Sequence, residues 1–247
     1  MTDGLVIRNH LGGVMVRRDN IPHTLHSRGL APWPSKGVIT DSGRSISNVP
    51  YSRINITGIQ APIIALRTRG DNDFVYGSTA YVDGKVYYHI FGPVSQQVEY
   101  FIFSQQQRQG GNSGLQVYKQ GSSELAFDSS WPMMIPVGVY SVGRESTSSH
   151  NLGTHPAFIQ LNQPMRGRSE RKWEYDAQDR KYYWWATEGQ TLALRVDGST
   201  LKSGYISGIG NSTSGLLRPL GPKQSQNFNG TLGPDTLKAL LINVSNL

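Results

Sequence analysis

The sequence has 247 residues, a formal net charge of +7 and no cysteine, which excludes disulfides, cysteine-ligated zinc and a thiol nucleophile. Only 37% of the residues are hydrophobic, and 28 glycines and 13 prolines divide the chain into short apolar runs. None of these runs approaches the roughly 18 consecutive apolar residues of a transmembrane helix, whereas short runs between turn residues predict an all-β protein.

The first predicted element is a hairpin over residues 4–19. Its arms are GLVI at 4–7 and VMVRRD at 14–19, with Gly12 and Gly13 in the turn between them. Apolar residues alternate in both arms at the two-residue period of a strand. The N-terminal stretch has an acid at position 3, and its short apolar run is broken by Arg8 and Asn9, so it does not have the pattern of a signal peptide.

An extended, basic arm is predicted over residues 20–50. This stretch holds four prolines and few apolar residues, which argues against a helix. We expect Arg28, Leu30 and Trp33 to anchor the arm against another chain. Residues 1–70 carry nine Lys and Arg against three Asp, which suits nucleic acid, an anionic glycan or an acidic partner. The charges are scattered, so a solvated surface is the simpler interpretation and nucleic acid is not expected.

Alternating strands follow at 53–57, 62–67, 75–81, 85–91 and 99–103. Asp83-Gly84 between two of these strands is a strong hairpin signal. Short strands at this spacing indicate a β-sandwich. We therefore predict a first β-sandwich domain over residues 1–108, which includes the arm.

A second β-sandwich-like domain is predicted over residues 113–247, after a polar joint at 104–113. It begins with a hairpin of arms 114–118 and 124–128, and strands are expected at 137–142, 156–161 and 236–244. Strands 182–185 and 191–196 are expected to pair across a turn at Glu188-Gly189, and Asp197-Gly198 forms a further turn. Residues 162–181 and the Gly-, Ser- and Asn-rich residues 203–235 are predicted to be long loops.

No residue pattern predicts catalysis, a cofactor or a metal. His23 and His26 form an H-x-x-H pair and His150 and His155 an H-x4-H pair, but neither pair has the further ligands of a metal site. The hydrolase motif G-x-S-x-G does not occur. The glycine-rich stretch at 208–215 lacks the lysine of a phosphate-binding loop. We therefore expect a protein that is not an enzyme.

Aromatic residues gather in one short stretch. Its members proposed to contact a receptor or a partner are Trp173, Tyr175, Tyr183, Trp184 and Trp185. In a strand, Tyr183 and Trp185 lie on one side and Tyr182 and Trp184 on the other. One side is expected to be core. The other side either fills a subunit interface or stacks on sugar rings, and both interpretations remain open.

The hairpin at 114–129, GLQVYKQGSSELAFDS, carries a family resemblance. It resembles the hairpin G-(L/I)-x-(V/I)-(Y/F)-(N/D)-x-x-G-x-x-x-F-D-S of small distal-tail proteins from bacteriophages with long non-contractile tails. Residues 4–19 repeat its outline loosely, and Lys119, Gln120 and Ser122 depart from its turn residues. The resemblance covers about 30 residues and brings no catalytic motif.

This resemblance implies a virion structural protein of the tail tip or baseplate, assembled in the host cytoplasm. The implied partners are other tail proteins and further copies of this chain, with a trimer suggested by general tail symmetry. Two alternatives remain. The first alternative is a receptor-binding module that recognises a host glycan or pilus. The second, which is less favoured, is a glycan-degrading enzyme.

Overall fold

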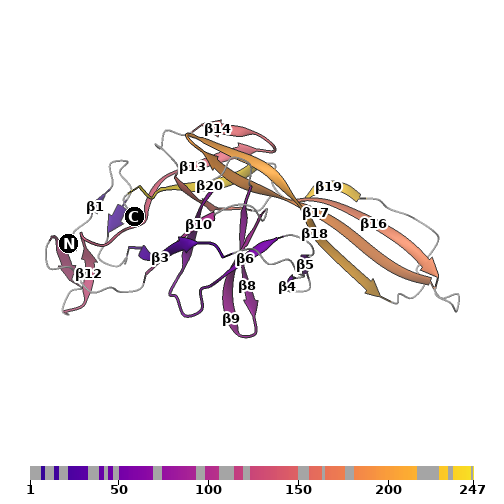
Figure 1. Cartoon of the computed structure of the whole chain (residues 1–247), viewed down its shortest axis with the longest axis horizontal. Helices are drawn as coiled ribbons and strands as arrows, with labels where there is room; N and C mark the ends of the chain where they lie inside the picture. The colour runs from indigo at the N-terminus through magenta and orange to yellow at the C-terminus, as the bar shows by residue number, and fades with distance from the viewer. Residues whose placement is uncertain are drawn as a thin grey trace, which may run out of the picture.

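The computed structural model describes residues 7–8, 14–16, 22–32, 39–41, 44–46, 50–68, 74–92, 98–105, 114–118, 123–149, 156–162, 165–175, 181–215, 228–232, 236–245 and 247. In these residues all regular structure is β-strand, and every paired strand is antiparallel to its neighbour (Figure 1). The predicted all-β class is therefore confirmed. The described part of the chain contains no helix with the length and apolarity needed to cross a membrane.

A six-stranded sheet forms one layer of the fold. Its strands, in spatial order, are β13 (Ile135–Gly143), β20 (Thr236–Asn243), β15 (Ala157–Gln160), β7 (Ile63–Thr68), β10 (Val98–Ser104) and β3 (Thr24–Leu30). Three of these strands precede residue 108 and three follow residue 113. The predicted boundary at 108–113 therefore does not separate two sheets, because β7 of the first half lies beside β15 of the second half, with Phe158 opposite Leu66.

Two further sheets make up the opposite layer. One has the order β6 (Tyr51–Asn55), β9 (Lys85–Phe91) and β8 (Tyr76–Val82). The other has the order β14 (Thr147–Ser149), β18 (Thr200–Gly215), β17 (Lys181–Asp197), β16 (Met165–Tyr175) and β19 (Phe228–Leu232). Val75, just before β8, joins them by exchanging two backbone hydrogen bonds of 2.9 and 3.0 Å with Leu194 of β17.

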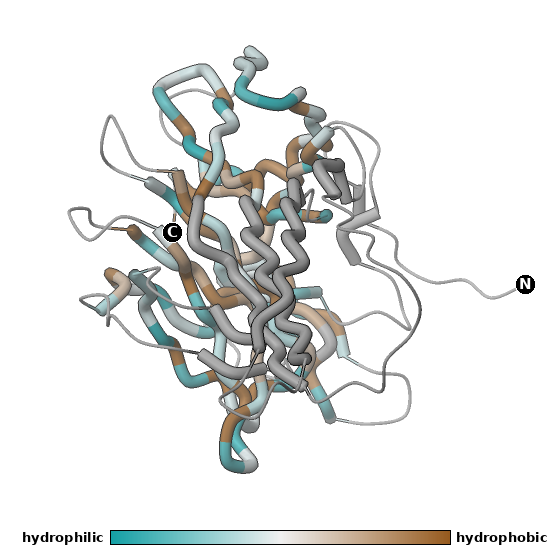
Figure 2. The backbone as a smooth tube through the Cα atoms, turned by 90° about the vertical axis from the view of Figure 1, so that its right-hand side faces the viewer, coloured by the Kyte–Doolittle hydropathy of each residue, from teal (hydrophilic) through white to brown (hydrophobic). Residues whose placement is uncertain are grey.

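The main hydrophobic core lies between these layers. Alternate residues of β7, such as Ile64 and Leu66, meet Ile54 and Ile90 of the three-stranded sheet and Leu194 of β17 in one buried cluster. Each such side chain contributes about 1.5–3 kcal/mol by leaving water. Hydrophobic stretches accordingly follow the strands, while turns at the outside are hydrophilic (Figure 2). This core combines residues from both halves of the chain, as the six-stranded sheet does.

The long strands of the five-stranded sheet correct three predictions. The stretch expected as a charged loop over 162–181 contains the eleven-residue strand β16. No turn occurs at Glu188-Gly189, because β17 continues through it with a register shift between Gly189 and Gln190. The loop predicted at 203–235 contains most of β18 and all of β19. The strands β16, β17 and β18 together form a ribbon that extends beyond the six-stranded sheet (Figure 1).

The arm predicted over residues 20–50 is also partly regular structure. Residues Thr24–Leu30 form β3, an edge strand paired with β10, and Leu25 packs against the buried cluster that contains Phe101 and Phe103. Prolines at 22 and 32 flank this strand, where they remove no hydrogen bond from the ladder. Strands β4 (Ile39–Asp41) and β5 (Arg44–Ile46) form a short hairpin further along.

Candidate functional site

The hairpin that carries the family resemblance is present as two short strands, β11 (Gln116–Tyr118) and β12 (Leu125–Asp128). The register pairs Gln116 with Asp128 and Val117 with Phe127. Phe127 is buried, whereas Leu115 and Tyr118 have 51% and 52% of their surface exposed. The hairpin therefore presents apolar side chains to solvent as well as to the interior.

The first residue of the motif, Gly114, and the last, Ser129, lie against each other at the open end of the hairpin. Ser129 accepts a hydrogen bond at its Oγ from the backbone N–H of Leu115, at 2.9 Å, and its own N–H donates to the carbonyl of Leu115 at 2.9 Å. Gly114 has a φ of 110°, and a β-carbon there would overlap Ser129 Oγ. A glycine at 114 thus makes room for the serine that closes the hairpin.

Asp128 is the buried polar centre of the same hairpin, with none of its surface exposed. Its Oδ1 accepts from the N–H and the hydroxyl of Ser130, at 2.7 and 2.5 Å, and its Oδ2 accepts from Gln116 Nε2 at 2.9 Å. A carboxylate that holds the backbone two residues ahead stabilises a turn. The F-D-S segment is therefore explained by local folding and requires no catalytic role.

The hairpin at the start of the chain has a related form. Strands β1 (Ile7–Arg8) and β2 (Val14–Val16) are antiparallel, with a register irregularity between Ile7 and Arg8. The second hairpin has its irregularity between Val117 and Tyr118. These positions correspond when the GLVI and GLQV segments are aligned, so the two hairpins share a backbone feature as well as a sequence outline.

The predicted aromatic contact residues lie in the projecting ribbon, and the structure describes their backbone positions. Trp173 is paired with Tyr183, Arg171 with Trp185 and Lys172 with Trp184. Alternation along the strands then places Trp173, Tyr175, Tyr183 and Trp185 on one face and Trp184 on the other. The register brings together four of the five residues that the sequence singled out.

Two of the three predicted anchors of the arm lie on β3. The Arg28 guanidinium donates a hydrogen bond to the carbonyl oxygen of Leu247, so it has a partner within the chain. Leu30, at the end of the strand, is 48% exposed. Trp33 lies outside the described residues.

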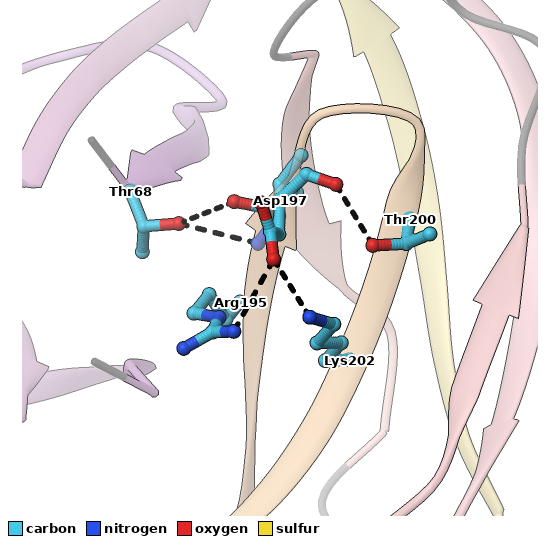
Figure 3. Close-up of polar contacts among 6 residues, drawn as sticks. Thr68, Arg195, Asp197, Thr200 and Lys202 are labelled. Atoms are coloured by element: carbon cyan, nitrogen blue, oxygen red, sulfur yellow. Dashed lines mark hydrogen bonds and ion pairs between the residues drawn. The ribbon is translucent and has the colours of Figure 1, made fainter. Parts of the chain in front are cut away.

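Arg195, Asp197 and Lys202 form an ion-pair cluster at the β17–β18 turn (Figure 3). The sequence did not predict this cluster. Asp197 Oδ2 contacts Lys202 Nζ at 2.7 Å and the Arg195 guanidinium at 3.3 Å, and the cations, Lys202 first, hold the pKa of Asp197 below its ordinary value. Thr68 Oγ1 of β7 bonds both the N–H and the carbonyl of Val196, at 3.2 Å each. The two Thr68 hydrogen bonds, and not the ion pairs, connect this end of the ribbon to the six-stranded sheet.

The histidine pairs and the glycine-rich stretch noted in the sequence do not form a metal or phosphate site in the described residues. Burial lowers the pKa of His23, and His26 contacts Ser27 Oγ at 3.2 Å. His150 and His155 lie outside the described residues. The stretch at 208–215 is part of β18. Among the residues that the structure describes, no three His, Cys, Asp or Glu side chains are grouped to hold a metal ion.

No protein-family model, curated protein or solved structure matches this chain.

Proposed function

We propose that this chain is a virion structural protein of a bacteriophage tail, at the tail tip or baseplate. It assembles with neighbouring tail proteins and with further copies of itself, and it supports attachment to the host. It is made in the host cytoplasm and resides in the virion. The chain is not an enzyme in this proposal.

The observation that carries the proposal is the motif hairpin. The residues that resemble the tail proteins are those that close the hairpin here, since Gly114 admits Ser129 and Asp128 binds Gln116 and Ser130. A chance similarity in sequence would not be expected to coincide with the residues that determine the local backbone. The half-exposed Leu115 and Tyr118 on the same hairpin suit contact with a neighbouring tail protein.

A second candidate function, receptor binding, is favoured by the ribbon. Its backbone register groups Trp173, Tyr175, Tyr183 and Trp185 on one face of strands that extend beyond the core. Tyrosine and tryptophan are frequent anchors at interfaces and on sugar rings. The occupant of this face is then a host glycan or pilus, and this role is compatible with a place in the tail.

The proposal is tested by deleting the gene from a phage that encodes this chain. We expect deletion particles with an incomplete tail tip or baseplate, or particles that fail to adsorb, and restoration when the wild-type chain is supplied in trans. Fully infectious deletion particles would contradict the proposal. A chain absent from purified wild-type virions would contradict it equally.

A further inference from the structure

A second polar site lies on the outer face of the three-stranded sheet β6-β9-β8. The register places Arg53 of β6 opposite His89 of β9, and Asn55 opposite Tyr87. The intervening residue Ile54 is buried in the main core. Arg53 and Asn55 therefore lie on the face turned away from that core, and both are exposed to solvent.

The Arg53 guanidinium is held at two points. Its Nε donates a hydrogen bond to Nε2 of His89 at 3.2 Å, and its Cζ lies 4.7 Å from the centre of the Tyr87 ring. His89 is 1% exposed and its ring stacks with Tyr87 at 6.5 Å, so the supporting groups are themselves packed. A guanidinium oriented before binding loses less entropy when a ligand arrives.

This arginine differs from Arg67 and Arg195 in its partner. Arg67 forms an ion pair with Glu99, and Arg195 with Asp197. Arg53 instead bonds a histidine nitrogen that accepts a hydrogen bond, and no carboxylate in the described part of the chain contacts it. Because Nε is engaged by His89, the two terminal amino groups remain as a fork for a two-oxygen anion.

Asn55 adds a neutral donor beside this fork. Its Oδ1 accepts from the backbone N–H of Thr57 at 3.0 Å, which directs its amide nitrogen away from that turn. Two residues along a strand span about 6.6 Å, roughly the length of a sugar ring with one substituent. The fork suits a carboxylate and the amide suits a hydroxyl, while the Tyr87 ring lies against the guanidinium and holds it in place.

We propose that Arg53, Asn55 and Tyr87 form a binding site for an acidic sugar, with the sugar carboxylate on the guanidinium of Arg53. The site deepens the attachment role and rests on the proposed function for its biological meaning. The binding itself is a property of the isolated chain. An acidic peptide shares the carboxylate but offers no ring of hydroxyls to Asn55, so the sugar is the better fit.

Calorimetric titration of the full chain tests this site with three probes. These are tetragalacturonate, its fully methyl-esterified form and tetraglutamate. We expect binding of tetragalacturonate only, because the ester removes the carboxylates and the peptide lacks the hydroxyls. Equal binding of the ester or of tetraglutamate would overturn the assignment to an acidic sugar, as would no heat with tetragalacturonate at millimolar concentration.

Variants of the same chain locate the site. Arg53→Ala is expected to weaken tetragalacturonate binding by about tenfold or more, since a charge-assisted fork is lost. Arg53→Lys keeps the charge but lacks the fork, so it is expected to be weaker than wild type as well. Lys238→Ala removes one charge from an exposed position of the opposite layer and serves as the matched control, with unchanged affinity.

Unaltered binding by both Arg53 variants would contradict the proposal. If Arg53→Ala lowers the unfolding temperature, the affinities of wild type and Arg53→Lys are compared instead. Lysine leaves the charge and the long aliphatic stem in place, so this variant changes the fork alone. The result is separable from the tail assignment. Absence of the protein from virions would contradict the tail role without changing the titration, and a failed titration would leave the tail role standing.

Discussion

The hydroxyl oxygen of Ser129 occupies the space that a β-carbon on Gly114 would take. The two residues stand at the ends of the motif, and the same hydroxyl accepts the N–H of Leu115. The glycine and the serine are therefore one structural unit. The motif then specifies how the hairpin closes, and two consequences for stability can be measured.

Gly114→Ala is expected to destabilise the protein by about 1–3 kcal/mol, because alanine is strained at this positive φ and its methyl group overlaps Ser129 Oγ. Ser129→Ala is expected to cost about 0.5–1.5 kcal/mol for the lost hydrogen bond. The double variant is expected to lose less than the sum, since removal of the hydroxyl relieves the overlap. Urea unfolding measures all three, and strict additivity would contradict the coupling.

Asp128→Ala is expected to destabilise the chain more than Gln116→Ala does. The first change removes the buried carboxylate and with it both hydrogen bonds from Ser130, and a hydrogen bond to a charged group contributes about 1.5–3 kcal/mol. The second removes one side-chain donor from an otherwise intact carboxylate. Chemical denaturation of the two variants provides the comparison. Equal losses would show that the Asp128–Ser130 turn does not stabilise the hairpin.

Gly77→Ala tests the packing of the three-stranded sheet against its own core. The ring of partly buried Tyr88 lies over Gly77, and a β-carbon there would overlap the tyrosine hydroxyl. Forcing the ring to move is expected to cost about 1–3 kcal/mol. Gly58→Asn is the control, because Gly58 has a φ of 80° with open space around it and asparagine tolerates this conformation. Thermal unfolding of both variants checks the prediction, and a tolerated Gly77→Ala would contradict it.

Turn chemistry made several hairpins predictable from the sequence. Asp83-Gly84 and Asp197-Gly198 both form turns, with Asp83, Gly84 and Gly198 at positive φ. The hairpin β8–β9 and the last strand were also expected near their observed bounds. In each case the signal is local, because a few neighbouring residues determine the turn and the alternation of the strands around it.

The pairing of distant strands could not be predicted in the same way. In β7 the consecutive residues Ile64, Ala65 and Leu66 are all buried, but nothing in the residues identifies β15 as a neighbour. The sequence alone therefore predicts two domains divided at 108–113. Gly189 was interpreted as a turn, whereas the structure places a register shift beside it. The charged residues 165–175 lack an apolar alternation because the ribbon extends beyond the core. The Asp197 cluster could not be predicted either, because it depends on the register that places Lys202 opposite Arg195.

The Asp197 cluster predicts a specific dependence of stability on pH. Its neighbours Lys202 and Arg195 lower the pKa of Asp197 in the folded protein. A lowered folded-state pKa stabilises the fold fully above the ordinary value of 3.8, and this contribution is lost as the pH falls through the folded-state value. Asp197→Asn is therefore expected to be less stable than wild type at about pH 6, with a difference that shrinks below about pH 4.

Lys202→Ala is the control for this prediction. In that background the same Asp197→Asn change is expected to have a smaller effect, since the closer cationic partner of the carboxylate is gone. Denaturation across the acid range measures both backgrounds. A difference between wild type and Asp197→Asn that stays constant from about pH 6 to about pH 2 would contradict the ion-pair account.

The ribbon supplies a matched pair of tryptophans for the receptor-binding candidate. Trp185 shares its face with Trp173 and Tyr183, whereas Trp184 lies on the other face opposite Lys172. If the aromatic face binds the host, Trp185→Ala is expected to slow adsorption of assembled particles by about tenfold or more, as for an anchor residue at an interface. Trp184→Ala is expected to have a smaller effect. Equal adsorption by the two variants would contradict this role.

The most direct test of the tail assignment is to locate the protein in particles. Purified virions of a phage encoding the chain are labelled with antibodies raised against the full chain and imaged by electron microscopy. The account predicts label at the distal end of the tail, with the protein also detected in the same particles by mass spectrometry. Label on the head, or protein found only in the lysate and not in the virions, would contradict it.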